Sequence, residues 1–143
     1  SKSFASVTIL FLLTACVSGS NRMIIPHDLA LDLSGTWDVE VRGKGWGYPL
    51  EGILIIDQQD KNLAGELTYL HNEEPSSIQN MEGQIEADKI VLKGVDIRSA
   101  EGDSMGLKPD NLTLYYSGKQ DFFEGKVYDS WGNRGFVQIV RKQ

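Results

Sequence analysis

The sequence predicts an all-β protein, a single up-and-down antiparallel barrel of about eight strands that follows a flexible N-terminal tether. Three observations predict this fold. From Ser34 onward, apolar and polar residues alternate with a period of two, and Gly, Asn and Asp interrupt the alternation at short intervals. No stretch repeats with the period of an amphipathic helix. A glycine unit that suits a sharply coiled strand recurs along the chain.

The alternating stretches define the expected strands. They cover residues 36–42, 50–57, 63–70, 78–85, 90–97, 112–118, 122–128 and 135–142. Some are joined by short turns rich in Asp, Asn and Lys, and others by longer segments. A chain of 143 residues favours one domain, long enough to bury a core without disulfide bonds.

The recurring glycine unit places a glycine between two apolar residues of one strand face. It occurs at residues 63–67 (LAGEL), 81–85 (MEGQI) and 123–127 (FEGKV). Alternation puts each glycine on the side of its apolar neighbours, so these glycines should point inward. A glycine lets a strand coil where a barrel closes tightly, although relief of crowding between two packed sheets is an alternative. We favour the closed barrel.

Connection lengths predict a polarity for this barrel. In up-and-down order, successive connections alternate between the two ends. The short connections, 58–62, 86–89 and 119–121, then share one end, and the long ones, 43–49, 71–77, 98–110 and 129–134, share the other. The first strand begins at the short-connection end, so we expect the N-terminal segment to enter there, with the long connections facing away from any membrane anchor.

The first residues have a different character. Lys2 precedes the apolar run 4–13, and the small residues Thr14 and Ala15 lead into Cys16. This order resembles the lipobox of a bacterial lipoprotein signal peptide. The resemblance implies cleavage before Cys16, a diacylglyceryl group on its thiol, and a mature protein held at a membrane by its N-terminus. The alternative is a small buried thiol inside a hydrophobic helix.

The lipobox resemblance divides the chain into a signal peptide (1–15), a lipidated cysteine with its tether (16–32) and the barrel domain (33–143). The apolar run is shorter than the roughly 20 residues of a membrane-spanning helix, which favours a cleaved signal. Val17 stands where Asp would retain a lipoprotein in the inner membrane, so resemblance to Gram-negative lipoproteins implies the periplasmic face of the outer membrane. The apolar second half of the tether should pack against the barrel.

Charge and residue types exclude several functions. The formal net charge is −6 at pH 7 without a Lys/Arg cluster, which makes nucleic acid a poor partner. A single cysteine excludes an intramolecular disulfide. No nucleophile motif, phosphate loop or metal-ligand spacing appears, so we expect no enzyme activity, cofactor or metal. We interpret the acidic segment 71–74 as a solvated loop.

The motif Gly35-Thr36-Trp37 opens the first strand. It resembles the start of calycin barrels, the group that contains lipocalins and avidins. The resemblance implies that Trp37 plugs the closed end and that a basic side chain of the last strand, here Arg141, lies across it. The T-D-Y motif of lipocalins and the biotin-binding set of avidins have no counterpart in this sequence. The resemblance therefore implies a shape and not a ligand.

The long-connection end holds the candidate binding residues. They are Trp46, Tyr48, Met105, Trp131 and Arg134. The first and last strands of a closed barrel are neighbours, so Trp46 and Trp131 should lie close together. Paired aromatic residues at a barrel mouth can line a ligand site or anchor a partner, and they can also simply cap the core.

Two functions remain open. One is a non-enzymatic interaction module of the cell envelope, which docks a partner or inhibits an enzyme through this end or through an outer face bearing Tyr115 and Tyr128. The other is a barrel that binds a small hydrophobic or aromatic ligand. We expect the inward side chains to fill a small barrel, which favours partner docking. The inward set comprises Trp37, Leu54, Ile56, Leu67, Tyr69, Leu92, Leu114, Tyr116, Phe123 and Phe136.

Overall fold

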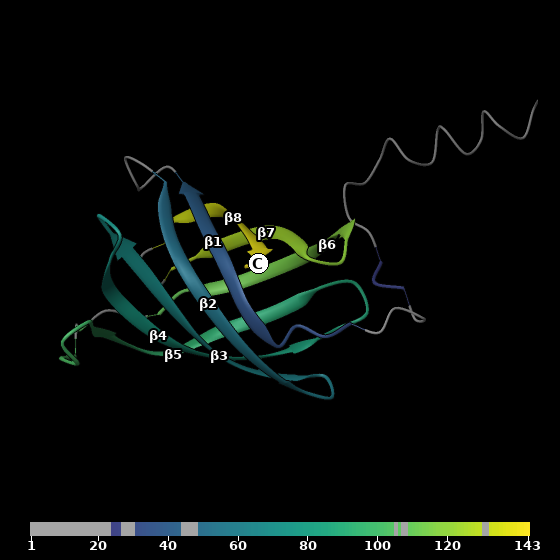
Figure 1. The fold of residues 1–143 in the computed structure, drawn as a ribbon, viewed down its shortest axis with the longest axis horizontal. Coiled ribbons are helices and arrows are strands. Elements are labelled where there is room, and N and C mark those ends of the chain that lie inside the picture. Colours follow the sequence, from purple (N-terminus) through teal and green to yellow (C-terminus); the bar gives the residue numbers. More distant parts are fainter. Residues whose placement is uncertain (1–23, 27–30, 44–48, 105, 107–108, 130–131) are drawn as a thin grey trace, which may run out of the picture.

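In the computed structural model, eight antiparallel strands form a closed barrel (Figure 1). The strands are β1 (Gly35–Gly43), β2 (Leu50–Gln59), β3 (Asn62–His71), β4 (Glu74–Ile85), β5 (Ile90–Ser99), β6 (Asn111–Lys119), β7 (Phe122–Tyr128) and β8 (Arg134–Arg141). Each pairs with its neighbours in sequence, and β8 pairs with β1 to close the cylinder. The structure describes residues 24–26, 31–43, 49–104, 106, 109–129 and 132–143. The predicted all-β fold and its up-and-down order are confirmed.

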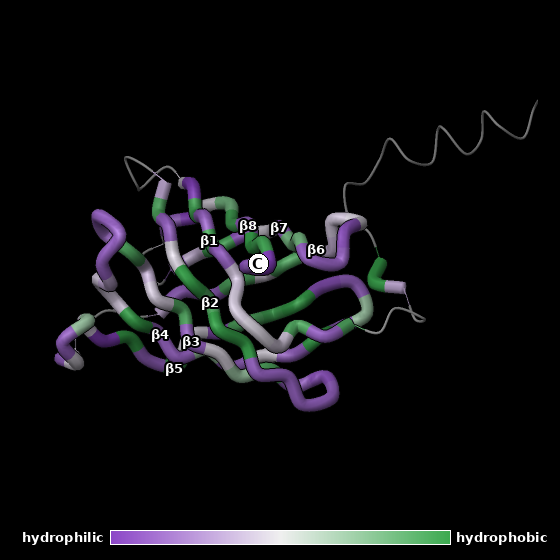
Figure 2. The backbone as a smooth tube through the Cα atoms, in the orientation of Figure 1, coloured by the Kyte–Doolittle hydropathy of each residue, from purple (hydrophilic) through white to green (hydrophobic). Residues whose placement is uncertain are grey.

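Alternating burial along most of the strands builds the core. In β8, Val137 and Ile139 are buried while Gln138 is exposed, and Figure 2 shows apolar and polar residues following one another along the strands. Phe136 corrects the expected inward set, because 71% of it is exposed. Since Val137 and Ile139 face inward, the parity of β8 places Phe136 outside.

The inward glycines sit where neighbouring strands approach most closely. A Cβ atom on Gly125 would lie 1.8 Å from the carbonyl oxygen of Thr113, and one on Gly83 would lie 1.8 Å from that of Val91. At Gly65 the corresponding distance, to the carbonyl oxygen of Ile55, is 2.8 Å. Any side chain at these positions would displace backbone, so the recurring unit is a requirement of strand coiling.

The short turns and the described part of the N-terminal segment lie together, at the right-hand end of the barrel in Figure 1. Leu33 is fully buried, and the backbone N–H of Ile25 donates to the carbonyl oxygen of Ala87 (3.2 Å). The side chain of Gln58 accepts from the N–H of Leu33 (2.8 Å) and donates to the carbonyl oxygen of Leu31 (3.1 Å). The described residues of the N-terminal segment, 24–26 and 31–33, therefore pack against this closed end.

Trp37 fills the closed end from inside. Its indole is fully buried, its Nε1 donates to the carbonyl oxygen of Leu33 (2.9 Å), and its ring meets that of Phe123 edge-on at 5.9 Å. The guanidinium of Arg141 lies over the ring. The two side chains that the calycin resemblance implied as a closed-end pair are in contact.

The β3–β4 connection corrects the expected loop lengths. The sequence predicted a long connection over residues 71–77, but β4 begins at Glu74, and only Asn72 and Glu73 form the turn. Both have positive φ, 50° and 66°, as a two-residue hairpin turn requires. Pro75 suggests a loop in the sequence, yet proline is tolerated near the start of a strand. The other connections at this end, 44–49, 100–110 and 129–133, are longer.

Among the described residues, β5 and β6 share fewer paired positions than any other two neighbouring strands of the barrel. Residues 90–93 pair with residues 111–114, and no described residue of β6 pairs with β5 beyond them. The N–H of Gly94 donates to the carbonyl oxygen of Asp110 (2.9 Å). Pro109 lies so close to Gly94 that a Cβ there would fall 2.1 Å from the Cβ of the proline. At this point β5 is therefore contacted by Pro109 and Asp110, which precede β6, and not by a continuous β-ladder.

Candidate functional site: a buried polar trio in the barrel mouth

Three polar side chains converge inside the long-connection end. Tyr69 lies near the end of β3, Gln79 lies on β4, and Asp110 precedes β6. They are 8%, 1% and 9% exposed. The Tyr69 hydroxyl donates to Asp110 Oδ2 (2.9 Å), and Gln79 Nε2 donates to the same oxygen (3.1 Å). Gln79 Oε1 accepts from the backbone N–H of Asp110 (2.8 Å), so Gln79 holds Asp110 at two points.

Burial dominates the electrostatics of this trio. It raises the pKa of Asp110 above its ordinary value, more than the hydrogen bonds from Gln79 and Tyr69 lower it, and repulsion from Asp129 adds to the increase. Burial also raises the pKa of Tyr69 well above its ordinary value, with the charge of Asp110 acting in the same direction. The Tyr69 phenol is therefore neutral, and its O–H group donates the hydrogen bond to the Asp110 carboxylate.

The facing wall of the barrel is apolar. Val127 on β7 and Val137 on β8 are buried, and Val137 is the register partner of the buried Val41 on β1. In the ring of strands, β7 and β8 lie across the barrel from β3 and β4. The mouth therefore combines one polar wall with one wall of small hydrophobic side chains.

Of the candidate binding residues from the sequence, the structure describes Arg134. Arg134 is the first residue of β8, is exposed, and pairs in register with Tyr128. The other expected binding residues, Trp46, Tyr48, Met105 and Trp131, lie outside the described residues, as does Cys16.

The sequence contained a signal for the trio that the analysis of motifs did not use. Counting back from the inward Gly83 and Met81 in steps of two places Gln79 inside. The same count from Leu112 places Asp110 inside. A polar residue on the inward parity of an otherwise apolar strand face was the informative feature.

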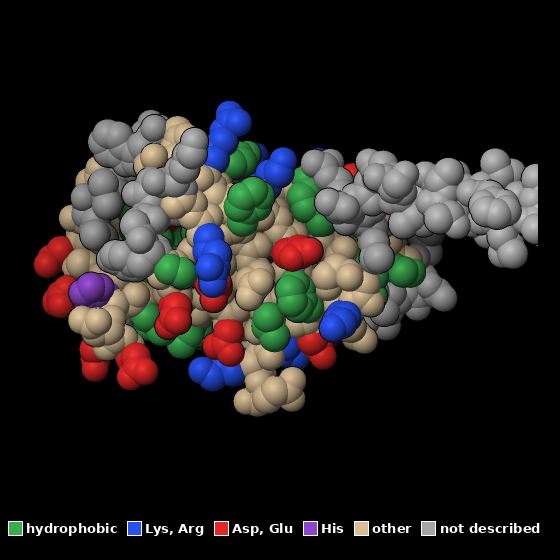
Figure 3. Space-filling view, turned by 90° about the horizontal axis from the view of Figure 1, so that it is seen from above, with side chains coloured by type: hydrophobic (Ala, Val, Ile, Leu, Met, Phe, Trp, Pro, Cys, Tyr) green, Lys and Arg blue, Asp and Glu red, His purple; other side chains and the backbone are tan. Residues whose placement is uncertain are grey.

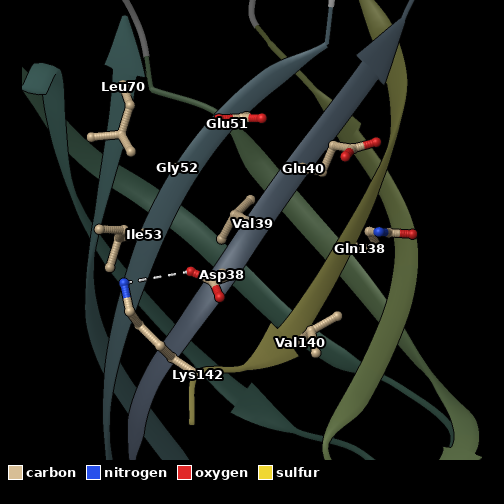
Figure 4. A pocket seen from close by; sticks show the side chains of 10 residues that line it. All are labelled: Asp38, Val39, Glu40, Glu51, Gly52, Ile53, Leu70, Gln138, Val140 and Lys142. Atoms are coloured by element: carbon tan, nitrogen blue, oxygen red, sulfur yellow. Dashed lines mark ion pairs between the residues drawn. The ribbon is translucent and has the colours of Figure 1, made fainter. Parts of the chain in front are cut away.

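A groove lies on the outer surface of the barrel. A groove of about 310 Å³ crosses the outer face of β1, β2 and β8, and Lys142 Nζ lies 3.8 Å from Asp38 Oδ1 beside it (Figure 4). Phe136 and Tyr128, 71% and 46% exposed, lie on the neighbouring outer face of β7 and β8. In Figure 3 acidic and basic side chains stand between the apolar ones over one face of the molecule. The residues that line the groove are Asp38, Val39, Glu40, Glu51, Gly52, Ile53, Leu70, Gln138, Val140 and Lys142.

No group of three or more His, Cys, Asp or Glu side chains in the described part of the chain is placed to hold a metal ion. Within the same residues, no helix has the length and apolar character needed to cross a membrane.

No protein-family model matches this chain, and no curated protein matches it. Several solved structures do. A redesigned β-barrel matches with a TM-score of 0.56 and 16% identity, over 78% of this chain and 92% of its own. A de novo designed fluorescence-activating β-barrel matches with a TM-score of 0.54 and 14% identity, over 77% and 94%. The redesigned barrel mFAP1, bound to DFHBI, matches with 0.56 and 16%, over 76% and 94%. At these identities the similarity shows the fold alone, and the chain is a closed eight-stranded up-and-down β-barrel.

Proposed function

We propose that this chain is a lipid-anchored, non-enzymatic barrel of the cell envelope that binds a small, mainly apolar or aromatic molecule at its long-connection end. The observation that carries the proposal is the convergence of Tyr69, Gln79 and Asp110 inside that end, across from buried valines. Ligand sites typically combine an apolar lining with a few convergent polar groups and perturbed pKa values. One similar barrel is fluorescence-activating and another is bound to DFHBI, which agrees with this use of the architecture.

The anchor rests on the sequence around Cys16. The described residues of the N-terminal segment pack against the closed end. The eight residue steps from Cys16 to Ile24 reach at most about 28 Å when fully extended. An acylated Cys16 would therefore keep the closed end near the bilayer and leave the mouth facing away from it.

Ligand binding is tested with the full chain in lipid nanodiscs, titrated with a panel of water-soluble aromatic probes by isothermal calorimetry. Empty nanodiscs correct for partitioning into lipid. Tyr69→Phe removes one buried hydroxyl, and Tyr128→Phe removes an exposed one as a matched control. We expect Tyr69→Phe to change probe affinity about five- to tenfold, the worth of one hydrogen bond, and the control to leave it unchanged. Absence of saturable binding by every probe contradicts the proposal.

The anchor is tested separately by mass spectrometry of chain purified from a Gram-negative host. We expect a mature N-terminus at Cys16 carrying acyl groups, and a Cys16→Ser variant released from the membrane fraction. An uncleaved, unmodified leader rules out the anchor without bearing on the ligand site.

Partner docking is the second candidate function, and one observation favours it. The outer groove of β1, β2 and β8 adjoins the exposed apolar side chains of Phe136 and Val140 on β8, and contiguous exposed apolar surface often marks an interaction site. Site-specific photocrosslinking from position 136 in intact cells tests this candidate. A discrete crosslinked protein, absent when the crosslinker replaces the equally outward Glu124, supports docking.

A further inference from the structure

We propose that the molecule held in the mouth is an organic cation, an ammonium or amidinium group on an apolar or aromatic body, and that the cation pairs with the carboxylate of Asp110. This inference rests on the proposed ligand-binding function and names the class of ligand. It follows from four features of the trio and its surroundings.

The first feature is a buried carboxylate without a counter-ion. Asp110 is 91% buried, since 9% of it is exposed. The ion pairs of the described residues join Arg42 to Glu40, Arg98 to Glu66 and Asp96, Arg141 to Asp121, and Lys142 to Asp38. None of them includes Asp110. A buried carboxylate is costly unless it is paired, so this group is poised for a positive partner.

The second feature is unused acceptor capacity. Both hydrogen bonds to the Asp110 side chain, from Tyr69 and Gln79, end on Oδ2. Oδ1 accepts none from the residues that the structure describes, although a carboxylate oxygen has two lone pairs. An N–H group of a ligand fits this position because it supplies both a donor and a charge.

The third feature is a buried hydroxyl beside the trio. Ser77 lies on the inward parity of β4, directly opposite Tyr69 in the β3–β4 register, and is 9% exposed. Its Oγ makes no hydrogen bond to any described residue. A serine hydroxyl accepts as well as donates, so Ser77 offers a second acceptor at the level of Tyr69.

The fourth feature is the sign of the local charge. Asp129, which follows β7, raises the pKa of both Asp110 and Tyr69 through its negative charge. Lys126, the described cation nearest to Asp129 in sequence, is exposed, and so is Arg134 at the start of β8. A cation inside the mouth relieves the repulsion between the two carboxylates, whereas an anion increases it. The valine wall then accommodates the apolar body of the same molecule.

The test compares three probes of similar shape: 2-phenylethylamine, which is positively charged, 2-phenylethanol, which is neutral, and phenylacetate, which is negatively charged. Binding to the full chain in nanodiscs is measured by calorimetry, with empty nanodiscs as the blank. We expect the amine to bind at least about tenfold more tightly than the alcohol, and phenylacetate to bind most weakly. Asp110→Asn should abolish the preference for the amine. The outward Asp38→Asn, which removes a carboxylate from the outer groove, should leave it intact.

A pH series on the unmodified chain keeps the test independent of how the variant folds. The amine stays protonated below about pH 9, so its affinity should rise with pH as Asp110 ionises. Equal affinities for amine and alcohol overturn the cation inference and leave the ligand site standing. Amine affinity that falls with rising pH also overturns it, because Asp110 then acts as a neutral donor. If none of the probes saturates, both this inference and the ligand site fail.

Discussion

Arg141 covers Trp37 and at the same time ties together three segments of the closed end. Its guanidinium carbon lies 4.4 Å from the centre of the Trp37 ring. Nη1 donates to the carbonyl oxygen of Ser34 (2.9 Å), Nη2 to that of Asp32 (2.6 Å), and Nε to the Asp121 carboxylate (2.8 Å). Arg141, at the end of β8, thus holds both the segment that enters β1 and the β6–β7 turn in place above the Trp37 indole.

Arg141→Lys should destabilise the barrel by about 1–2 kcal/mol, because a lysine keeps the charge but cannot supply three divergent donors and a stacked plane. Urea unfolding monitored by circular dichroism measures the loss. Arg42→Lys is the matched control, since the Arg42 side chain is 67% exposed and contacts only Glu40 among charged partners of the described residues. We expect the control to stay within about 0.5 kcal/mol. Equal losses in the two variants would show that the closed-end contacts add nothing to stability.

Gly125→Ala should be far more costly than an alanine in an open turn. The new Cβ would fall 1.8 Å from the carbonyl oxygen of Thr113, so the β6–β7 ladder must move. We expect a loss above about 3 kcal/mol, at the upper end for overpacking. Gly102→Ala meets nothing within 4 Å but occupies a φ of +95°, and it should cost only about 1–2 kcal/mol of backbone strain. A tolerated Gly125→Ala would contradict the close approach of β6 and β7.

Asp110 should give the barrel a distinctive pH dependence. Burial raises the folded-state pKa of Asp110 above the ordinary 3.8. At pH values between the unfolded-state pKa and the folded-state pKa, the folded state therefore binds more protons than the unfolded state. The contribution of this group to stability therefore falls as pH rises through that window. Asp110→Asn keeps an acceptor oxygen for Tyr69 and Gln79 but cannot ionise. The difference in unfolding free energy, variant minus wild type, should become more positive from about pH 4 to about pH 7.

The exposed Asp38→Asn variant provides the comparison for that pH series. Its unfolding free energy should follow that of the wild type, within about 0.5 kcal/mol, at each pH. If Asp110→Asn also runs parallel to the wild type, Asp110 does not titrate as a buried carboxyl.

Phe136→Ser should leave stability within about 0.5 kcal/mol of the wild type, because its side chain lies mostly in solvent. Phe123→Ser, at a fully buried position that contacts Trp37, should by contrast cost about 3–5 kcal/mol. Thermal unfolding of both variants checks the assignment of inner and outer faces. A large loss from Phe136→Ser would mean that this face is covered by part of the protein itself.

Most of the fold could be predicted from the sequence. Alternation of apolar and polar residues with a period of two indicates where each strand runs and which of its side chains face the core. The β3–β4 turn could not, because its left-handed residues Asn72 and Glu73 are followed by Pro75, which indicates a loop whenever strand pairing is unknown. Phe136 was expected inside, although its parity with Gln138 already argued for the outside.

The candidate site was harder to predict than the strands. Motif searches look for residues that are near in sequence, whereas Tyr69 and Asp110 are 41 positions apart and meet only when the barrel closes. Parity along β4 and β6 pointed Gln79 and Asp110 inward. It could not show that the two would share hydrogen bonds, because that depends on the shear between strands that are not neighbours.

The short β5–β6 pairing makes the side of the cylinder less uniformly hydrogen-bonded than the rest of its described wall. Past Gly94, β5 forms no ladder with the described residues of β6, so deuterium exchange of its amides should be faster there than in the strands that are paired along their length. Local opening of the wall beside Pro109 and the backbone of Asp110 would therefore break fewer hydrogen bonds between strands than opening elsewhere in the barrel.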